Sequence, residues 1–108
     1  MSDNKIETAA VPLSSMVEFQ GGSIVSREII KKPGGTVTLF AFDEGQGLSE
    51  HTAPFDAMVQ AVEGEVEITI SGKSHVLKAG DMIVMPSGEP HALKALKKFK
   101  MLLVMIRS

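Results

Sequence analysis

The pattern of apolar and polar positions along this chain predicts short β-strands from residue 23 onward. Apolar or alternating segments are separated by turn-forming residues roughly every 8 to 12 positions, which is typical of an all-β fold. The predicted strands cover residues 23–30, 36–42, 57–62, 66–70, 74–77, 82–85, 91–96 and 99–106. We expect a Gly-rich loop over residues 43–50 and a short helix or an edge strand over residues 6–17.

Alternation within the strands predicts which faces are buried. Val66, Ile68 and Ile70 alternate with polar residues, so that strand should bury one face and expose the other. Residues 82–85 are apolar throughout and are predicted to form a buried strand. About eight strands without crossover helices predict a β-sandwich or β-barrel.

Composition fits one soluble domain. At 108 residues, with 44% hydrophobic and 22% charged residues, the chain can bury a single core. Its net charge of −2 and its lack of Trp and Tyr argue against a nucleic-acid partner. The basic cluster at Lys94, Lys97, Lys98 and Lys100 is therefore interpreted as charge that keeps a strand edge soluble.

The chain contains no cysteine, which excludes disulfides, thiolate zinc sites and cysteine nucleophiles. A cytoplasmic location fits this composition. The N-terminus lacks a basic segment followed by an apolar one, and the apolar run over residues 101–106 is too short to span a bilayer. We therefore expect no membrane partner.

The segment GDMIVMPSGEPH, residues 80–91, combines a strand, a turn and a histidine at a fixed offset. Gly80, five residues, Pro86, one residue, Gly88, two residues and His91 follow one another in the order of a known motif. This segment resembles the second motif of the cupin superfamily, except that Ala95 stands where the motif ends in asparagine.

The first cupin motif is only partly present upstream. Gly45, His51 and Gly64 match its glycine, first histidine and final glycine. Ala53 stands where the motif has its second histidine, and Ala57 where it has glutamate. Fifteen residues separate the two motifs, which is the shortest spacing in the family.

The resemblance implies an all-β fold, the cupin-type double-stranded β-helix or jelly-roll barrel, in a single domain over residues 21–108. Residues 1–20 are expected to form an N-terminal extension that contacts the second subunit of a homodimer. Typical cupins hold one divalent metal with two histidines and a glutamate from the first motif and one histidine from the second. Only His51 and His91 remain here, so the resemblance implies that an ion of Zn, Fe, Ni or Mn is bound weakly or not at all.

Asp56, next to the missing glutamate, is the candidate for a third metal ligand. Because strand residues alternate, Asp56 points outward if Ala57 faces the barrel interior, unless the turn at Pro54 shifts the phase. Its alternative role is to cap backbone N–H groups in a loop. The candidate metal ligands are thus His51, His91 and Asp56, and the side chains expected to line the site are His51, His91, Ala53, Ala57 and Val59.

Other chemistry-bearing residues have simpler interpretations. Glu50 is expected to be solvated, and His75, on a separate hairpin, to be structural or exposed. The methionines in predicted strands are interpreted as core packing, with an adaptable apolar pocket as the alternative; they are Met58, Met82, Met85, Met101 and Met105.

Three functions remain open. The first is a cupin that binds a small molecule in the barrel, with a degenerate metal site at His51 and His91. The alternative is a mononuclear metal-dependent enzyme of the dioxygenase or isomerase type. In the third, the site is vestigial, the two histidines are hydrogen-bonded neutral side chains, and the domain acts by association. No catalytic residue can be assigned, because the sequence contains no nucleophile elbow, phosphate loop or paired acid and base.

Overall fold

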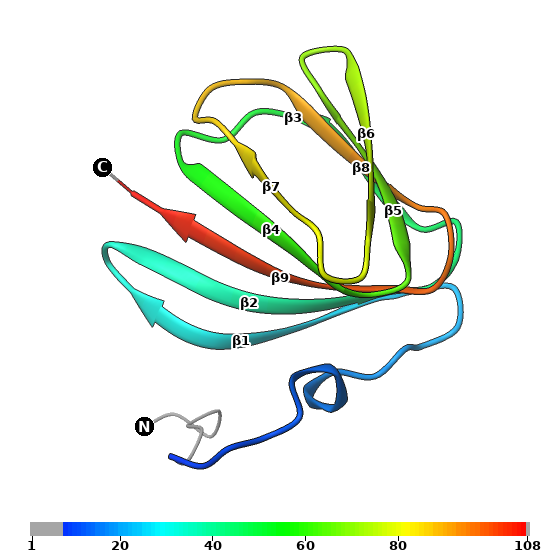
Figure 1. Cartoon of the computed structure of the whole chain (residues 1–108). Helices are drawn as coiled ribbons and strands as arrows, with labels where there is room; N and C mark the ends of the chain where they lie inside the picture. The colour runs from blue at the N-terminus through cyan, green and yellow to red at the C-terminus, as the bar shows by residue number, and fades with distance from the viewer. Residues whose placement is uncertain (1–7, 108) are drawn as a thin grey trace.

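The computed structural model describes residues 8–107 and consists of two antiparallel β-sheets packed face to face (Figure 1). One sheet has five strands in the order β1 (Ile24–Lys32), β2 (Gly35–Phe42), β9 (Phe99–Ile106), β4 (Asp56–Glu63) and β7 (Met82–Met85). The other has four strands in the order β3 (Gly47–His51), β8 (His91–Ala95), β5 (Glu65–Ile70) and β6 (Lys73–Lys78). From β3 onward the chain passes repeatedly between the two sheets, as the jelly-roll prediction requires. No helix in residues 8–107 is long and apolar enough to cross a membrane.

Each predicted strand overlaps an observed one, but the predicted loop over residues 43–50 is wrong in its second half. Residues 47–51 form β3, which pairs with β8. A Cβ on Gly47 would lie 2.3 Å from the carbonyl oxygen of Leu93. This glycine therefore permits a close approach of two strands, and it does not mark a loop.

The prediction that residues 82–85 form a buried strand holds for one face only. β7 lies at the edge of the five-stranded sheet, and its inner face packs on the core while nothing within residues 8–107 covers its outer face. Met85 is buried, whereas Met82 is 51% exposed and Val84 is 52% exposed.

The main core fills the space between the inner faces of the two sheets. Phe42 and Phe99 are fully buried, and their ring centroids lie 5.6 Å apart. In β5, Val66 and Ile68 are fully buried, which confirms the alternation predicted for that strand. Burial of such side chains contributes about 1.5–3 kcal/mol each.

Residues 8–20, here called the N-terminal strap, lie outside the five-stranded sheet (Figure 1). Instead of an α-helix the strap contains the 3₁₀ turn η1 (Leu13–Met16), and the beginning of the segment predicted for this element lies outside the described residues. Val17 is buried against Leu39 and Ala41 on the outer face of the sheet. Part of the extension expected to contact a second subunit thus packs on its own sheet.

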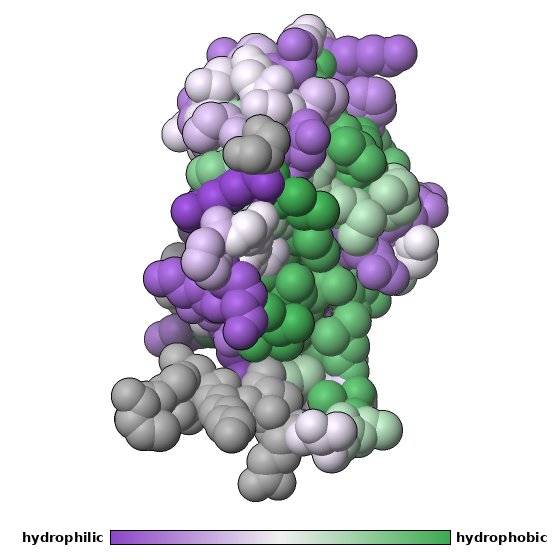
Figure 2. All heavy atoms as spheres, turned by 90° about the vertical axis from the view of Figure 1, so that its left-hand side faces the viewer, coloured by the Kyte–Doolittle hydropathy of each residue, from purple (hydrophilic) through white to green (hydrophobic). Residues whose placement is uncertain are grey.

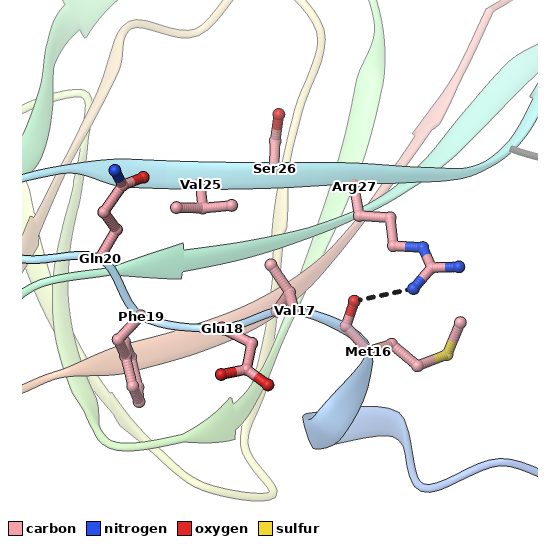
Figure 3. A pocket seen from close by; sticks show the side chains of 8 residues that line it. All are labelled: Met16, Val17, Glu18, Phe19, Gln20, Val25, Ser26 and Arg27. Carbon is pink, nitrogen blue, oxygen red and sulfur yellow. Dashed lines mark hydrogen bonds between the residues drawn. The ribbon is translucent and has the colours of Figure 1, made fainter.

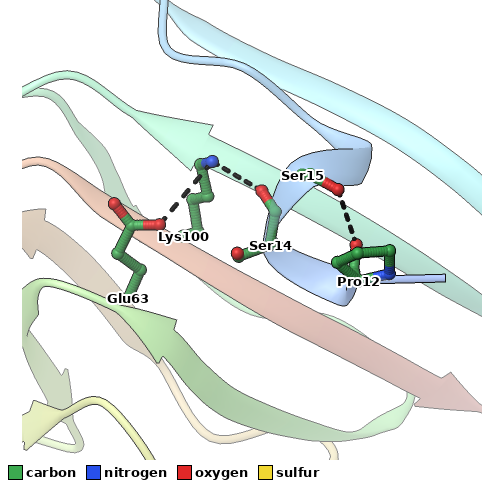
Figure 4. A network of polar contacts seen from close by, with 5 residues as sticks. All are labelled: Pro12, Ser14, Ser15, Glu63 and Lys100. Atoms are coloured by element: carbon green, nitrogen blue, oxygen red, sulfur yellow. Dashed lines mark hydrogen bonds and ion pairs between the residues drawn. The ribbon is translucent and has the colours of Figure 1, made fainter.

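Lys100 holds the strap in place (Figure 4). Its Nζ donates a hydrogen bond of 2.6 Å to the carbonyl oxygen of Ser14 and lies 3.6 Å from a carboxylate oxygen of Glu63. The same ammonium lies 4.8 Å from the ring centroid of Phe19. Lys100 is buried, and these partners compensate its desolvation. One of the four clustered lysines is therefore a structural group and not surface charge.

Asp43 fixes the point where the strap enters β1. Its carboxylate accepts hydrogen bonds of 2.7 Å from the backbone N–H of Gly22 and 2.9 Å from that of Glu44. These bonds stabilise the ionised form, and the pKa of Asp43 is held below its ordinary value of 3.8.

Candidate functional site

The structure brings His51 and His91 together at one end of the barrel. β3 ends at His51, β8 begins at His91, and the two residues are direct partners across these strands. Their Nε2 atoms lie 3.1 Å apart. His91 is 6% exposed, while His51 lies at the rim. The structure therefore brings the histidines of the two motifs into contact.

Backbone carbonyl groups orient both imidazole rings. His51 Nδ1 lies 2.8 Å from the carbonyl oxygen of Ser49, and His91 Nδ1 lies 3.2 Å from that of Glu89. Because a carbonyl oxygen can only accept, we assign the hydrogen of each neutral ring to Nδ1. The two Nε2 atoms lie within hydrogen-bonding distance, so either one ring donates an N–H to the other or the two lone pairs face a cation between them.

This arrangement fits a metal ion. Metal-bound histidines commonly donate the second ring N–H to a backbone carbonyl, which fixes the tautomer as it is fixed here. His51 and His91 would hold the ion through Nε2, since these atoms lie 3.1 Å apart and metal–nitrogen bonds measure about 2.0–2.1 Å.

A cavity of about 70 Å³ lies beside the two rings. Its lining is apolar apart from the two imidazoles and consists of Leu48, His51, Ala53, Ala57, Met85, His91, Leu93, Met101, Leu103 and Met105. A buried water needs about 10–15 Å³ of such space, so the cavity has room for a few waters. Pockets for organic ligands measure about 300–1,000 Å³, so this cavity suits an ion or a ligand of a few atoms.

The structure places the three additional candidate residues at two depths of the barrel. Ala53 and Ala57 line the cavity, but Val59 does not. Val59 faces inward as predicted and is fully buried, one row deeper, where it is paired with Ile83 and Leu103. Alternation along a strand predicts which face of the sheet a side chain lies on. It does not predict how far that side chain lies from the end of the barrel.

The structure does not bring Asp56 to the histidines. Asp56 Oδ1 accepts a hydrogen bond of 2.9 Å from the backbone N–H of Ser87, while its neighbour Ala57 faces the core. This is the capping role weighed as its alternative. Within residues 8–107, no cluster of three or more His, Cys, Asp or Glu side chains could hold a metal.

The sequence predicted core packing for the methionines, with an adaptable apolar pocket as the alternative, and it did not place them beside the histidines. Met85 and Met105 are the partners of Ala57 on the two strands next to β4. All three residues line the cavity. The methionines were visible in the sequence, but their meeting depends on the strand order β9-β4-β7, for which the sequence carries no local signal.

The remaining candidates lie elsewhere. Glu50 is exposed, and His75 is half-buried on β6, opposite Ile68. A larger hollow of about 550 Å³ separates the strap from β1 (Figure 3), where Arg27 donates a hydrogen bond of 3.2 Å to the carbonyl oxygen of Met16. The charged residues that line this hollow are Glu18 and Arg27. Because the hollow is wide open to solvent, it does not enclose a ligand as a binding pocket does.

Comparison with known proteins decides the family. Residues 38–107 match the model of the cupin domain family, which covers more than half of the chain. The chain belongs to the cupin family. A conserved protein of unknown function from Streptococcus pyogenes is 35% identical to this cupin, covers 100% of it and 96% of its own chain, and superposes with a TM-score of 0.93.

Other solved structures are similar. A cupin superfamily protein from Desulfitobacterium hafniense DCB-2 is 24% identical over 98% of this cupin and 97% of its own chain, with a TM-score of 0.91. A cupin 2 conserved barrel domain protein from Leptotrichia buccalis is 37% identical over 87% of this cupin and 46% of its own chain, with a TM-score of 0.84. A search of curated proteins found no match.

Proposed function

We propose that this cupin binds one metal ion, together with a ligand of a few atoms, at the His51–His91 pair. The observation that carries the proposal is the 3.1 Å separation of two Nε2 atoms whose rings are both held by backbone carbonyls through Nδ1. A cation satisfies both lone pairs at once. The rigid orientation of the rings also lowers the entropic cost of binding.

The affinity for divalent ions should be weak compared with cupins that keep all four ligands. Loss of one group that merely supports a ligand costs about 10- to 100-fold in metal affinity. Here Ala53 and Ala57 replace two ligands outright. When bound, a metal held by two histidines has positions open for water or a small ligand, which it would bind and polarise.

A metal-dependent enzyme of the dioxygenase or isomerase type is the alternative. Such an enzyme needs space for an organic substrate beside the metal, and a cavity of about 70 Å³ does not provide it. The geometry therefore favours binding over catalysis on an organic molecule. We also infer a cytoplasmic location, which the lack of cysteine favours.

Calorimetric titration of tag-free, chelator-treated protein with Zn(II) and Co(II) tests the proposal. We expect one site, lost in His91→Ala and in the His51→Ala, His91→Ala double variant. The control is His75→Ala, which removes the third histidine at a distance from the pair and should leave binding unchanged. Absence of binding of these ions at about 1 mM, together with absence of Cu(I) binding under anaerobic conditions, would refute the proposal, as would a site that survives the double substitution.

A further inference from the structure

The wall of the cavity opposite the histidines contains a row of methionines. Ala57 on β4 is paired with Met85 on β7 and with Met105 on β9. Cross-strand neighbours on one face have Cβ atoms about 4.5–5.5 Å apart, so both methionines flank the methyl group of Ala57. Met101, paired with Ala61 further along the same sheet, lines the cavity as well.

The methionines and histidines share this one space although they come from different sheets. Met85 and Met105 belong to the five-stranded sheet, whereas His51 and His91 belong to the four-stranded sheet. All four line the same cavity of about 70 Å³. The position that carries a carboxylate in typical cupins is therefore occupied by a methyl group between two methionine residues on neighbouring strands.

Thioether sulfur changes the metal that such a site prefers. Thioethers and thiolates select Cu(I), imidazole accepts copper, zinc, iron and nickel, and carboxylates favour harder ions such as Mn(II) and Mg(II). Two imidazoles and two thioethers without a carboxylate form a soft donor set. Cu(I) also does not require a high coordination number. A site without carboxylates, which offers few donors, is therefore sufficient for it.

The lack of charge in the cavity lining also favours Cu(I) over a divalent ion. The cavity lining contains no acidic residue, so every available donor is neutral. The cost of moving an ion from water into an apolar site grows with the square of its charge, so a divalent ion has about four times the cost of a monovalent one. Without a carboxylate to offset that cost, the site favours a monovalent cation.

We propose that the ion held at this site is Cu(I), bound by the imidazoles of His51 and His91 and by the thioether sulfurs of Met85 and Met105. The inference rests on the proposed function, because it requires the histidine pair to bind metal. It adds that the methionines are ligands, which packing of the core alone would not require.

Anaerobic competition with bicinchoninate, a coloured Cu(I) chelator, tests the inference. We expect one Cu(I) per chain, bound at least tenfold more weakly by the Met85→Leu, Met105→Leu double variant, whose side chains have nearly the same volume. Met82→Leu is the control, since Met82 lies on the same strand β7 but is 51% exposed. X-ray absorption at the copper edge should show sulfur neighbours in the wild type and lose them in the double variant.

Zinc binding distinguishes the two possible failures. If the methionines are ligands for Cu(I), the double variant keeps the Zn(II) affinity of the wild type, because the imidazoles are unchanged, and its circular dichroism and thermal midpoint confirm that it is folded. Cu(I) binding of equal strength in the wild type and the double variant, with zinc binding intact, would overturn this inference alone. Loss of the proposed function would appear differently, as an absence of any metal binding that depends on the two histidines.

Discussion

At the residue scale, two alanines determine which ions and ligands the barrel can bind. Ala53 and Ala57 line the cavity where typical cupins have a histidine and a glutamate. Each removes a donor and leaves space, and the space beside Ala57 is bounded by Met85 and Met105. This cupin therefore differs from a four-ligand metal site at only two residues, but it lacks the negative charge of the carboxylate.

Restoring the carboxylate should restore affinity for divalent metals. We expect Ala57→Glu to bind Zn(II) and Co(II) at least tenfold more tightly than the wild type, because a carboxylate would then offset the desolvation of the ion. Without metal the same variant should unfold at a lower temperature, since Ala57 is 6% exposed and the new charge would be buried unpaired. Calorimetric titration and thermal unfolding with and without metal measure both effects.

Ala57→Gln is the matched control, with the same shape and no charge. It should not gain affinity for divalent metals. Equal zinc affinity in the Glu and Gln variants would show that the missing charge is not what limits this site.

The sequence was sufficient for the residues whose positions follow from motif spacing. His51, His91, Ala53 and Ala57 lie where the motifs place them, because each is fixed by a nearby turn and by strand alternation. Met85 and Met105 were not predictable as neighbours of Ala57, since their meeting depends on which strands lie beside β4. Local patterns determine the face of a residue, whereas long-range pairing determines its neighbours.

At the scale of elements, the strands were predictable wherever apolar alternation marks a buried face. β3 was missed because it is short, mostly exposed and begins at a glycine that reads as a turn. β7 was predicted to be a buried strand because all four of its residues are apolar, but Met82 and Val84 on its outer face are exposed. Both errors occur in strands that border the histidine pair or the methionine row.

The tight turn between β4 and β5 gives a prediction at this scale. Gly64 has a φ of 84°, and a Cβ there would lie 1.8 Å from the carbonyl oxygen of Lys98. Gly64→Ala should therefore lower the free energy of unfolding by more than about 2 kcal/mol, because left-handed strain adds to a backbone clash. Urea unfolding measures the change.

Gly72→Ala is the control for this prediction. Gly72 has a φ of 81° but no heavy atom within 4 Å of the added Cβ, so only the conformational cost of about 1 kcal/mol applies. If the two variants lose the same stability, the close contact with Lys98 does not exist in solution.

On the scale of the whole molecule, an apolar row crosses the outer face of the five-stranded sheet. Neighbouring strands pair its members one to one, from β7 through β4, β9 and β2 to β1: Val84, Met58, Val104, Val37 and Ile30. Four inter-strand spacings of about 4.8 Å give the row a length of about 19 Å. Figure 2 shows hydrophobic side chains gathered in a band on the side of the molecule where β1 and β9 end.

We propose that a second copy of the chain covers this row in a homodimer. An uncharged row can pack against itself about a two-fold axis, as an isologous interface requires. The contact differs from the one expected from the sequence, because Val17 of the strap is buried on its own sheet beside the row. Sedimentation equilibrium should give about 23 kDa, twice the chain mass of 11.5 kDa.

A charged residue in the row should separate the subunits. We expect Val84→Glu to sediment as a monomer and Val76→Glu, with Val76 equally exposed on β6 of the other sheet, to remain a dimer. A wild-type mass near that of one chain would disprove the dimer, and a dimeric Val84→Glu variant would exclude this face.

The contact between Gly47 and Leu93 has a consequence beyond the packing of two strands. It sets how closely β3 approaches β8, and these strands carry the two donor nitrogens. A residue outside the cavity therefore influences the spacing of the two nitrogens. Substitution of Gly47 would change that spacing without altering any residue that lines the cavity.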